Sequence, residues 1–409
     1  MAQKCEYLII GAGLAGHHAA AEIRARDEDA TLVIIGAEPH RPYNRPPLSK
    51  AVLTGQAAAD SVFIEKKDFY ADKGIELICG AAASALDADK KKVILADGRE
   101  MGYGKLLIAT GGNARRLNIP GWELPGVFTL RSLDDSLAIK EAAAEAGRVA
   151  VIGGGFVGAE AASSLAESGK KVAAIFPQET YLGRILPYDF GQFLNRVYRE
   201  RGVEILPGDS VVAFEGNGRL KRLQTTKGKA IECDLAVVGA GIELQTAFAR
   251  EALELDRSGA IVTDGQLRSS AEDIWAAGDI ASYYDGLYRR QMRFEHWSTA
   301  MNQGKIAGAA MAGEPQPFAS PAYFFSVLFG MFIQIGGNFE PGDTVRRGDP
   351  NEKAVGYYSF HEGVIEGYTV LGRPQEEEKF VQKLILDRRR KEDLAKLLAD
   401  EAGDLSSLV

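Results

Sequence analysis

The residues best suited to bind a reactive cofactor lie in two glycine-rich turns that share one sequence pattern. The first turn spans residues 11–16 after the apolar stretch 7–10, and the second spans 153–158 after 149–152. In such a turn the first glycine permits the bend out of a strand, the second lets the backbone approach a pyrophosphate, and the third lets a helix pack closely on the sheet. Unpaired N–H groups at the start of the helix then face the phosphates. The two turns therefore predict two dinucleotide sites.

The residues of both turns are expected to contact a cofactor. They are Gly11, Gly13, Leu14, Ala15, Gly16, Gly153, Gly154, Gly155, Phe156, Val157 and Gly158. A dinucleotide fold places a carboxylate on the adenosine ribose roughly 20 residues or slightly more beyond the first glycines. Glu38, after the strand-like residues 31–35, stands there, and its alternative role is a solvated loop acid. We expect the ribose role because the glycines and the strand precede it.

Strands and helices must hold these turns in place. The order of strand, glycine turn, helix and strand occurs twice, with one expected helix at 17–25 and downstream strands at 31–35 and 171–175. Strands that alternate with helices are typical of parallel sheets in an α/β fold. A chain of 409 residues is also too long for one ordinary core. We predict two Rossmann-like dinucleotide-binding domains and a small C-terminal α+β domain.

Composition excludes some functions. A net charge of −8 argues against a nucleic-acid binder that relies on a globally basic surface. The 46% hydrophobic and 25% charged residues are typical of a soluble globular protein. The N-terminal residues lack the long apolar run of a signal peptide, so the cytoplasm is the expected location. The five histidines form no pattern of metal ligands, and we expect no metal.

The cysteines restrict the redox chemistry. Cys5, Cys79 and Cys233 are widely scattered and form no C-x-x-C or C-x-x-x-x-C pair that could alternate between dithiol and disulfide. We expect each to be a small buried hydrophobic residue rather than a reactive thiol. A dithiol relay is therefore excluded.

A proline-rich loop follows the first repeat. Residues 40–50 contain three prolines that hold the backbone extended, after which 48–50 can begin a helix. A rigid loop that presents Arg45 and Lys50 suits contacts with a pyrophosphate and a ring, whereas a purely structural loop needs neither cation. We expect both cations at the first cofactor.

Four motifs in order resemble the FAD-dependent ferredoxin reductase family, which includes putidaredoxin and rubredoxin reductases. They are R-P-P-L-S-K at 45–50, A-T-G at 109–111, A-A-G-D at 276–279 and E-H-W-x-x-A-x-x-Q-G at 295–304. The chain also resembles apoptosis-inducing factor and monodehydroascorbate reductase. The resemblance covers essentially the whole chain and is weakest in its last ninety or so residues.

The resemblance implies FAD in the first fold and NADH or NADPH as the substrate of the second. It places Lys50 beside the flavin, Asp279 at the ribityl chain, and His296 and Trp297 near the flavin ring, although the last two have the alternative role of ordinary interface residues. The further residues that we expect at the FAD are Ala82, Ala109, Thr110, Gly111, Gly278 and Glu295.

The second fold departs from its relatives at Gln178. In apoptosis-inducing factor and monodehydroascorbate reductase a glutamate at this place approaches the adenosine ribose. An amide still binds a hydroxyl and repels a 2′-phosphate less, so NADH and NADPH both stay open. Arg184 either meets such a phosphate or is a surface arginine. The second module ends, as the first does, in glycines that we expect at the nucleotide: Gly239 and Gly241, with Ala240 between them.

Lys50 and Glu160 are the candidate catalytic residues. Glu160 follows Gly158 by two positions, and the family's G-x-E pattern places this acid near the lysine beside the flavin. We hypothesise an ion pair close to flavin N5, in which the cation favours the reduced, anionic flavin and the acid holds the lysine. The alternative is two unrelated surface charges.

The implied reaction is hydride transfer from the nicotinamide to the flavin, followed by direct transfer of electrons to an acceptor. The leading acceptor is a small iron–sulfur protein, ferredoxin or rubredoxin, with Arg289, Arg290 and Arg293 as docking residues or as a solvated basic turn. One alternative is a protein like apoptosis-inducing factor, whose redox state controls assembly with partners. Another is an NAD(P)H oxidase or quinone reductase. Interaction with nucleic acid or membrane is not expected, and a homodimer is possible.

The expected boundaries follow the motifs. We assign 1–114 and 239–316 to FAD binding, 115–238 to NAD(P) binding and 317–409 to the C-terminal domain.

Within the C-terminal domain the apolar run 323–333 is too short to span a bilayer and is expected to be a core strand. Relatives often have F-W-S-D here, whereas this chain has Phe325 and Val327 in place of the tryptophan and aspartate. Strands at 354–360 and 364–371 and a charged helix at 376–386 are expected to follow, and 387–393 to form a solvated helix face.

Overall fold

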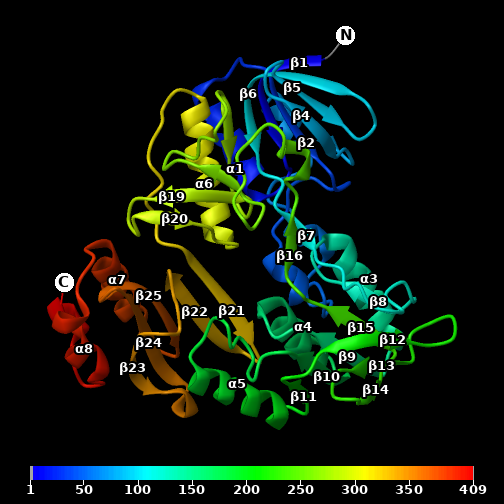
Figure 1. Ribbon diagram of the computed structural model, residues 1–409, viewed down its shortest axis with the longest axis vertical. Coiled ribbons are helices and arrows are strands. Elements are labelled where there is room, and N and C mark those ends of the chain that lie inside the picture. Colours follow the sequence, from blue (N-terminus) through cyan, green and yellow to red (C-terminus); the bar gives the residue numbers. More distant parts are fainter. Residues whose placement is uncertain (1–2, 409) are drawn as a thin grey trace. The chain divides into compact units, whose positions relative to one another are not determined.

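The structure is a computed structural model that describes residues 3–408 and divides them into two compact units (Figure 1). Unit 1 takes the residues up to Asn44, Val62–Asn113 and Glu243–Ala322. Unit 2 takes Arg45–Ser61, Ala114–Ile242 and the residues from Tyr323 onward. The expected four-segment division by cofactor stays a prediction, because compactness does not test which cofactor a segment binds.

Unit 1 is built on a seven-stranded sheet in the order β3-β2-β1-β6-β5-β4, with β18 also paired to β6. Its strands are β1 (Gln3–Ile10), β2 (Leu32–Gly36), β3 (Ile75–Cys79), β4 (Ala83–Asp87), β5 (Lys92–Leu95), β6 (Glu100–Ile108) and β18 (Ile274–Ala276). β1, β2, β3, β6 and β18 pair in parallel, and β4 and β5 pair antiparallel. Buried parallel strands read as continuous apolar runs, which explains why residues 8–10 and 32–35 carry no polar side chain.

Two helices of small residues lie against each other in unit 1: α1 (Leu14–Arg26) and α6 (Trp297–Met311) (Figure 1). Gly304 and Gly308 face α1, since a Cβ at Gly304 would lie 2.3 Å from Ala15 O and one at Gly308 2.5 Å from Ala19 O. Helix α1 begins at Leu14, three residues before the predicted start, because Gly13 is its N-cap residue.

Smaller elements complete unit 1. They are α2 (Phe69–Asp72), η3 (Ala247–Ala249), β17 (Ile261–Thr263), β19 (Ala281–Asp285) and β20 (Arg290–Met292). The short η2 (Ala59–Val62) lies where the chain passes from unit 2 back into unit 1. The paired strands β7 (Gly112–Ala114) and β16 (Ile242–Leu244) carry the chain from one unit into the other and back.

Unit 2 repeats the parallel plan in the order β11-β10-β9-β15-β8. The elements are η1 (Pro46–Ser49), β8 (Val127–Thr129), α3 (Leu133–Glu145), β9 (Arg148–Ile152), α4 (Phe156–Glu167), β10 (Lys171–Phe176), α5 (Tyr188–Glu200), β11 (Glu204–Pro207) and β15 (Leu235–Val238). An antiparallel sheet of β12 (Val211–Glu215), β13 (Arg222–Thr225) and β14 (Ala230–Glu232) is inserted before β15. The predicted duplication of strand, glycine turn, helix and strand is therefore present.

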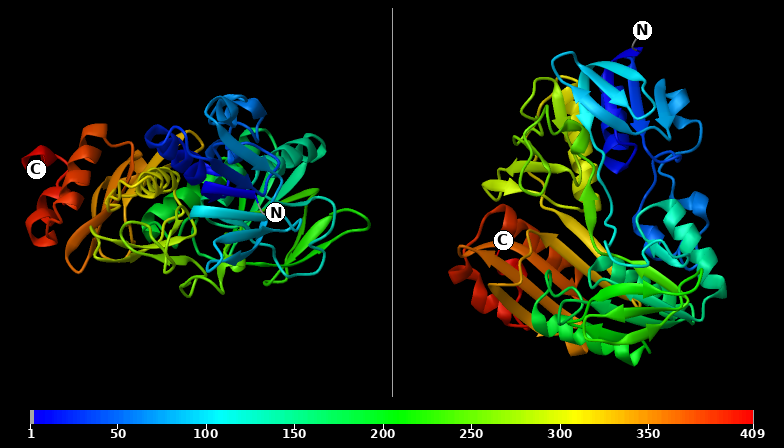
Figure 2. Two further views of the ribbon diagram at one scale, coloured as in Figure 1. Left: turned by 90° about the horizontal axis from the view of Figure 1, so that it is seen from above. Right: turned by 45° about the vertical axis from the view of Figure 1, so that its right-hand side comes forward.

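The C-terminal part of unit 2 is a five-stranded antiparallel sheet in the order β21-β22-β25-β24-β23. It comprises β21 (Tyr323–Leu328), β22 (Met331–Gly337), β23 (Thr344–Asp349), η4 (Pro350–Glu352), β24 (Ala354–His361), β25 (Val364–Leu371), α7 (Gln375–Leu386), α8 (Lys391–Ala399) and η5 (Leu405–Leu408). Helices α7 and α8 pack on this sheet (Figure 2). This confirms the predicted α+β character of the segment.

The prediction of a single core strand at 323–333 is wrong. The run forms a hairpin, in which Phe329 and Gly330 make the turn between β21 and β22 with φ of 49° and 75°. A two-residue turn with both φ positive matches the twist of paired strands. Phe325 and Phe332 face outward and are 46% and 44% exposed.

Two short segments also differ from expectation. Residues 46–49 form a 3₁₀ turn that begins at Pro46, because proline suits the first position of a helix, and Lys50 follows this turn rather than lying inside a helix. In the charged segment 387–393, residues 387–390 form a turn, in which Arg389 donates to Leu408 O and Arg390 to Glu362 O. Residues 391–393 begin α8 with Glu392 and Asp393 exposed, so the predicted solvated helix face covers only the end of the segment.

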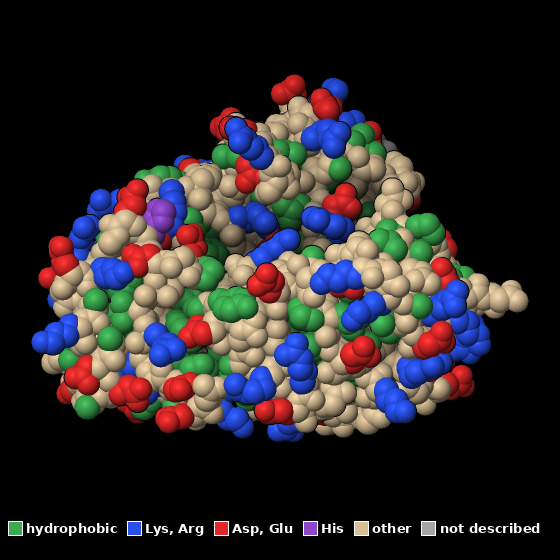
Figure 3. Space-filling model, turned by 60° about the horizontal axis from the view of Figure 1, so that its bottom comes forward, with side chains coloured by type: hydrophobic (Ala, Val, Ile, Leu, Met, Phe, Trp, Pro, Cys, Tyr) green, Lys and Arg blue, Asp and Glu red, His purple; other side chains and the backbone are tan. Residues whose placement is uncertain are grey.

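The surface carries mixed charge. On the face drawn in Figure 3, lysine and arginine side chains are interspersed with aspartate and glutamate. That face offers no uniformly basic area of the kind that nucleic-acid binding needs. Within residues 3–408, no helix combines the length and the apolar character needed to cross a membrane.

The contact between α1 and α6 yields a stability prediction. Gly304→Ala places a methyl group against backbone that cannot move aside, and such overpacking lowers the free energy of unfolding by about 1–3 kcal/mol. The matched control is Gly286→Ala in an exposed turn of unit 1, where an added Cβ meets nothing within 4 Å. Chemical denaturation of both variants checks this, and equal midpoints would contradict the described packing.

Candidate functional site

The register of unit 1 brings three distant segments to one sheet edge. Ile10 pairs with Ile35 and with Ile108, and Ile108 pairs with Ala276. The glycine turn after β1, the A-T-G segment after β6 and the A-A-G-D segment after β18 therefore follow strands that end at the same level. Ligands of parallel α/β sheets bind beyond this carboxyl edge.

The glycines of the first turn have two different functions. A Cβ at Gly11, whose φ is +122°, would lie 2.1 Å from Ala109 O, and one at Gly16 would lie 2.0 Å from Gly11 O. The fold itself requires these two glycines. A Cβ at Gly13 would meet no protein atom within 4 Å, so the space beside it is open. Open space beside the N-cap of a helix fits the pyrophosphate of a dinucleotide.

The second turn divides its glycines in the same way. A Cβ at Gly153 would lie 2.3 Å from Gly239 O, and one at Gly158 would lie 2.1 Å from Gly153 O. Gly155 is exposed, and a Cβ there would meet nothing within 4 Å. The second turn thus offers a second cradle of the same shape, and both cradles fit the nucleotides that the sequence implies.

The two turns differ at their middle position. In unit 1 a Cβ at Gly36 would lie 2.5 Å from the Cβ of Ala12, whereas in unit 2 a Cβ at Gly154 would lie 2.9 Å from the ring of Phe176. Phe176 is fully buried, with its ring centroid 4.5 Å from that of Tyr181. Packing against Phe176 therefore requires a glycine at position 154. The sequence interpretation had treated Gly154 only as a cofactor contact.

The candidate ribose contacts lie where the strands end. Glu38 follows β2 and accepts a hydrogen bond from the hydroxyl of Tyr43, which orients its carboxylate. Gln178 follows β10 and is half-buried, and the turn 180–183 rests on the second cradle because Leu182 N donates to Gly154 O at 2.8 Å. Arg184 is exposed beside this turn. Their roles toward a nucleotide stay predictions.

The A-A-G-D segment lies beside the first cradle. A Cβ at Gly278 would be 3.5 Å from that of Ala15. Gly278 N donates to Gln303 Oε1 at 2.8 Å, and Arg293 Nη1 donates to Asp279 O at 3.1 Å. Gln303 is 1% exposed, and its Nε2 has no hydrogen-bond partner among residues 3–408. The sequence interpretation quoted Gln303 within its motif but assigned it no role, although a buried amide with an unused donor is typical of a ligand site.

The E-H-W segment forms the start of α6. His296 is the N-cap residue, and burial lowers the pKa of its imidazole to about 4, so the ring is neutral at neutral pH. Trp297 Nε1 donates to Asn44 Oδ1 at 2.9 Å, which ties the 40–44 loop to this helix. Glu295 pairs with Arg293 at 2.7 Å. Because Arg293 also binds Asp279 O, it serves the internal structure, which argues against its predicted docking role.

Other predicted cofactor residues lie in the connecting turns. Thr110 Oγ1 donates to Gln245 O at 2.6 Å, and Ala82 O accepts from Ala96 N at 2.8 Å. Gly241 O accepts from Arg115 N at 2.9 Å where the chain leaves the second module. The remaining predicted residues at these turns are Ala109, Gly111, Gly239 and Ala240, which directly follow β6 and β15.

Lys50 and Glu160 form an ion pair in unit 2. Lys50 Nζ lies 2.7 Å from Glu160 Oε1, and the two side chains are 21% and 8% exposed. Helix α4 presents Glu160 in its second turn, directly after the close contact that Gly158 allows. The predicted pair is therefore present in unit 2, whereas its position next to a flavin stays a prediction.

Two serines complete the surroundings of Glu160. Ser49 Oγ donates to Oε2 and Ser326 Oγ to Oε1, the latter at 2.7 Å. Sequence reasoning included both serines in the stretches it compared with the family, Ser49 in R-P-P-L-S-K and Ser326 between Phe325 and Val327, but it assigned neither of them a role.

Arg45 is held by backbone. Its Nη1 donates to Arg131 O at 2.8 Å, just before α3. Sequence reasoning did not single out Arg131, whose carbonyl fixes the guanidinium of Arg45 in unit 2.

The cysteines cannot form a dithiol relay. All three are free, and burial raises the pKa of Cys5 and of Cys233 to about 12. Cys79 is half-buried, and burial raises its thiol pKa as well. Within residues 3–408 no three potential ligands gather in a way that would hold a metal ion.

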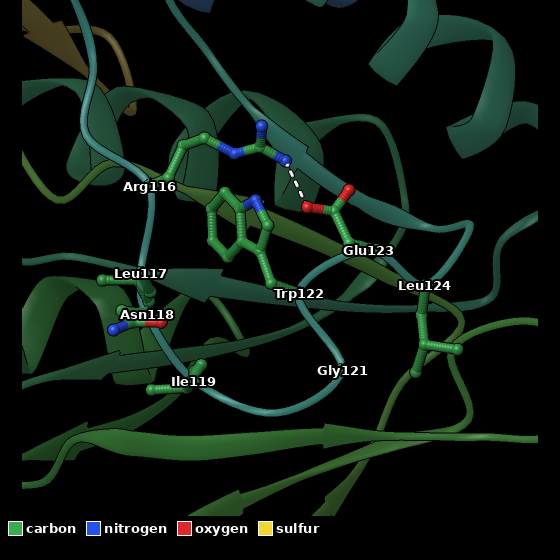
Figure 4. A pocket seen from close by; sticks show the side chains of 8 residues that line it. All are labelled: Arg116, Leu117, Asn118, Ile119, Gly121, Trp122, Glu123 and Leu124. Carbon is green, nitrogen blue, oxygen red and sulfur yellow. Dashed lines mark hydrogen bonds and ion pairs between the residues drawn. The ribbon is translucent and has the colours of Figure 1, made fainter.

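A surface pocket lies in the segment 116–124 of unit 2 (Figure 4). Arg116 lies over Trp122, with its guanidinium 5.7 Å from the ring centroid, and pairs with Glu123 at 2.8 Å. The aliphatic lining residues pack on the core of the second module. The two charged groups that line the pocket, Arg116 and Glu123, bind each other. The contacts of the lining residues therefore hold this segment on the second module, and they add no reactive group.

Comparison with known proteins agrees with this geometry. Residues 5–304 match the profile of the pyridine nucleotide-disulphide oxidoreductases. A probable ferredoxin reductase of Castellaniella defragrans is 34% identical over 390 residues, which cover 94% of this chain and 95% of that protein. Rubredoxin-NAD(+) reductase of Pseudomonas putida is 32% identical over 328 residues, covering 80% and 85%. Putidaredoxin reductase in its covalent complex with putidaredoxin matches with a TM-score of 0.92 and 27% identity over 99% of this chain and 98% of that chain.

Two glycine cradles on two parallel sheets define the fold of a flavoprotein reductase with two dinucleotide sites, as the sequence predicted. The chain belongs to the pyridine nucleotide-disulphide oxidoreductase family. It is an FAD-dependent NAD(P)H oxidoreductase, which confirms the enzyme class and both cofactors expected from the sequence.

The open glycines give a prediction that separates the two cofactors. Gly13→Ala and Gly155→Ala add methyl groups that touch no protein atom, so both apoproteins keep their stability. Gly13→Ala is expected to weaken FAD binding at least about tenfold and Gly155→Ala to weaken NAD(P)H binding by the same factor, about 1.4 kcal/mol.

Each variant serves as the control of the other. Fluorescence titration of the apoprotein with FAD, and of the holoprotein with a non-reducible nicotinamide analogue, measures the two affinities. Loss of the same cofactor from both variants would contradict the assignment of the cradles.

Proposed function

We propose that this enzyme takes a hydride from NAD(P)H held at the second cradle and passes electrons singly to a small iron–sulfur carrier of the ferredoxin or rubredoxin type. The names of its relatives support this acceptor, since they include a probable ferredoxin reductase and a rubredoxin-NAD(+) reductase. The absence of a cysteine pair supports direct transfer from the flavin.

The buried ion pair is the observation that carries the proposal. Bound FAD supplies the redox chemistry, and the chain supplies orientation and electrostatics. An ammonium group has three N–H donors. Lys50 gives one to Glu160 and a second to Pro46 O at 3.1 Å. The third is available for the flavin, where a fixed cation favours acceptance of a hydride.

The remaining roles follow the geometry of each cradle. Glu38 binds the adenosine ribose of FAD, and Gly278 and Asp279 bind its ribityl and pyrophosphate part. Gln178 binds the adenosine ribose of NAD(P)H through its amide. Arg184 binds the 2′-phosphate when the nucleotide is NADPH. The cytoplasmic location and the homodimer also stay predictions.

Lys50→Ala tests the proposal. Loss of the cation is expected to slow flavin reduction by NAD(P)H about tenfold or more, while FAD content falls little, because the cradle glycines retain FAD. The control is Lys140→Ala, an exposed lysine on α3 in the same unit. Anaerobic stopped-flow measurement of flavin bleaching, followed by mixing with ferredoxin, rubredoxin, quinone or oxygen, gives both the rate and the acceptor.

Equal losses of reduction rate and FAD content in Lys50→Ala would contradict the role of the ion pair. Rapid reduction of oxygen or quinone, with none of ferredoxin or rubredoxin, would contradict the proposed acceptor.

A further inference from the structure

Strand β21 carries a buried hydroxyl from the C-terminal sheet to the carboxylate of the ion pair. Ser326 is 0% exposed, and its Oγ lies 2.7 Å from Glu160 Oε1. Lys50 Nζ lies at the same distance from the same oxygen. One carboxylate oxygen therefore accepts from an ammonium group and from a hydroxyl 166 residues away in the sequence.

The second oxygen of Glu160 is also engaged. Oε2 accepts from Ser49 Oγ in the 3₁₀ turn that precedes Lys50. Both oxygens are bonded, so any rotation of the carboxylate breaks at least one hydrogen bond. Glu160 is 6% exposed, and water cannot readily replace the lost partner.

The next turn of α4 is fixed to the same two segments. Ser163 Oγ accepts from Phe329 N at 2.8 Å, in the turn of the β21–β22 hairpin. Ser164 Oγ donates to Ser49 O at 2.8 Å. Helix α4 thus joins the lysine-bearing turn on one side to the hairpin on the other, with Glu160 at the junction.

Strand alternation explains why a serine belongs at 326. Neighbouring residues of a strand point to opposite faces. Phe325 faces outward at 46% exposure, and Ser326 faces inward toward Glu160.

We propose that Ser326 is a positioning residue for hydride transfer: it fixes the carboxylate of Glu160, which in turn fixes the ammonium of Lys50. The inference rests on the proposed function, because it takes Lys50 to act on the flavin. Ser326 itself touches neither cofactor in this account.

The test is a double-mutant cycle on the FAD-loaded protein with Ser326→Ala, Glu160→Ala and the double variant. The matched control is Ser359→Ala, since Ser359 is also buried in the C-terminal sheet but its Oγ is bonded to the backbone groups Asn338 O and Glu340 N rather than to Glu160. The first measurement is the midpoint potential of the bound FAD by anaerobic redox titration, with FAD content alongside. The second is the rate of flavin reduction by NAD(P)H.

Ser326→Ala is expected to move the potential to a more negative value and to slow reduction about tenfold, the effect of losing a hydrogen bond to a charged group. Neither quantity changes further when Ser326→Ala is added to Glu160→Ala, because the hydroxyl acts through that carboxylate. Ser359→Ala behaves as the unmodified protein.

Suppose that Lys50→Ala still slows flavin reduction. The inference is then overturned if Ser326→Ala changes neither the potential nor the rate. It is also overturned if Ser326→Ala has the same effect in the unmodified protein and in the Glu160→Ala variant. If Lys50→Ala changes neither potential nor rate, the proposed function fails, and the inference fails with it. The Lys50 variant thus distinguishes the two failures.

Discussion

The carboxylate of Glu160 imposes the constraint on which unit 2 depends. A buried charge is tolerated only when it is paired and hydrogen-bonded, and removal of one partner of such a pair costs about 3–5 kcal/mol. Glu160 meets this requirement with three donors from two other chain segments: Ser49 and Lys50 of the proline-rich loop, and Ser326 of β21. The proline-rich loop, helix α4 and the C-terminal sheet must therefore meet at one point. A stability requirement and the proposed catalytic geometry are satisfied by the same contacts.

The duplicated glycine turns show how one local design serves two sites. In each turn the outer glycines permit backbone contacts closer than any side chain allows, and the glycine at the helix N-cap leaves open space. The two modules differ at the last residue of the strand beside the turn, which is Gly36 of β2 in unit 1 and Phe176 of β10 in unit 2. Phe176 begins a row of tilted ring contacts with Tyr181 and Tyr198, and Phe329 of the hairpin turn contacts the ring of Tyr198 in an edge-on arrangement. Packing in unit 2 therefore connects the end of β10 to the C-terminal sheet.

Sequence reasoning predicted the features that depend on neighbouring residues. Turn, helix and strand patterns identified both cradles and the α/β fold, because each pattern is complete within about thirty residues. The lysine–glutamate pair required the family resemblance, since its members come from separate segments. Ser326 and Gln303 were missed because their partners, Glu160 and Gly278, are set by tertiary contacts.

The hairpin in the run 323–333 was missed for a local reason. Apart from Ser326 and Gly330 the run is apolar, so no group of polar residues divides it into two strands. Phe329 adopts φ of 49° there, which is unusual for a bulky residue. The hydrogen bond from Phe329 N to Ser163 Oγ helps to hold that conformation, and Ser163 lies far away in the sequence.

The central claim is that bound FAD accepts the hydride of NAD(P)H without a further redox group of this chain. Anaerobic titration of the FAD-loaded protein with NADH or NADPH tests it most directly, by following flavin absorbance against added nucleotide. Flavin and nicotinamide each carry two electrons, so about one equivalent per FAD is expected to bleach the flavin completely. Consumption of a second equivalent before full bleaching would reveal another redox group and contradict the account.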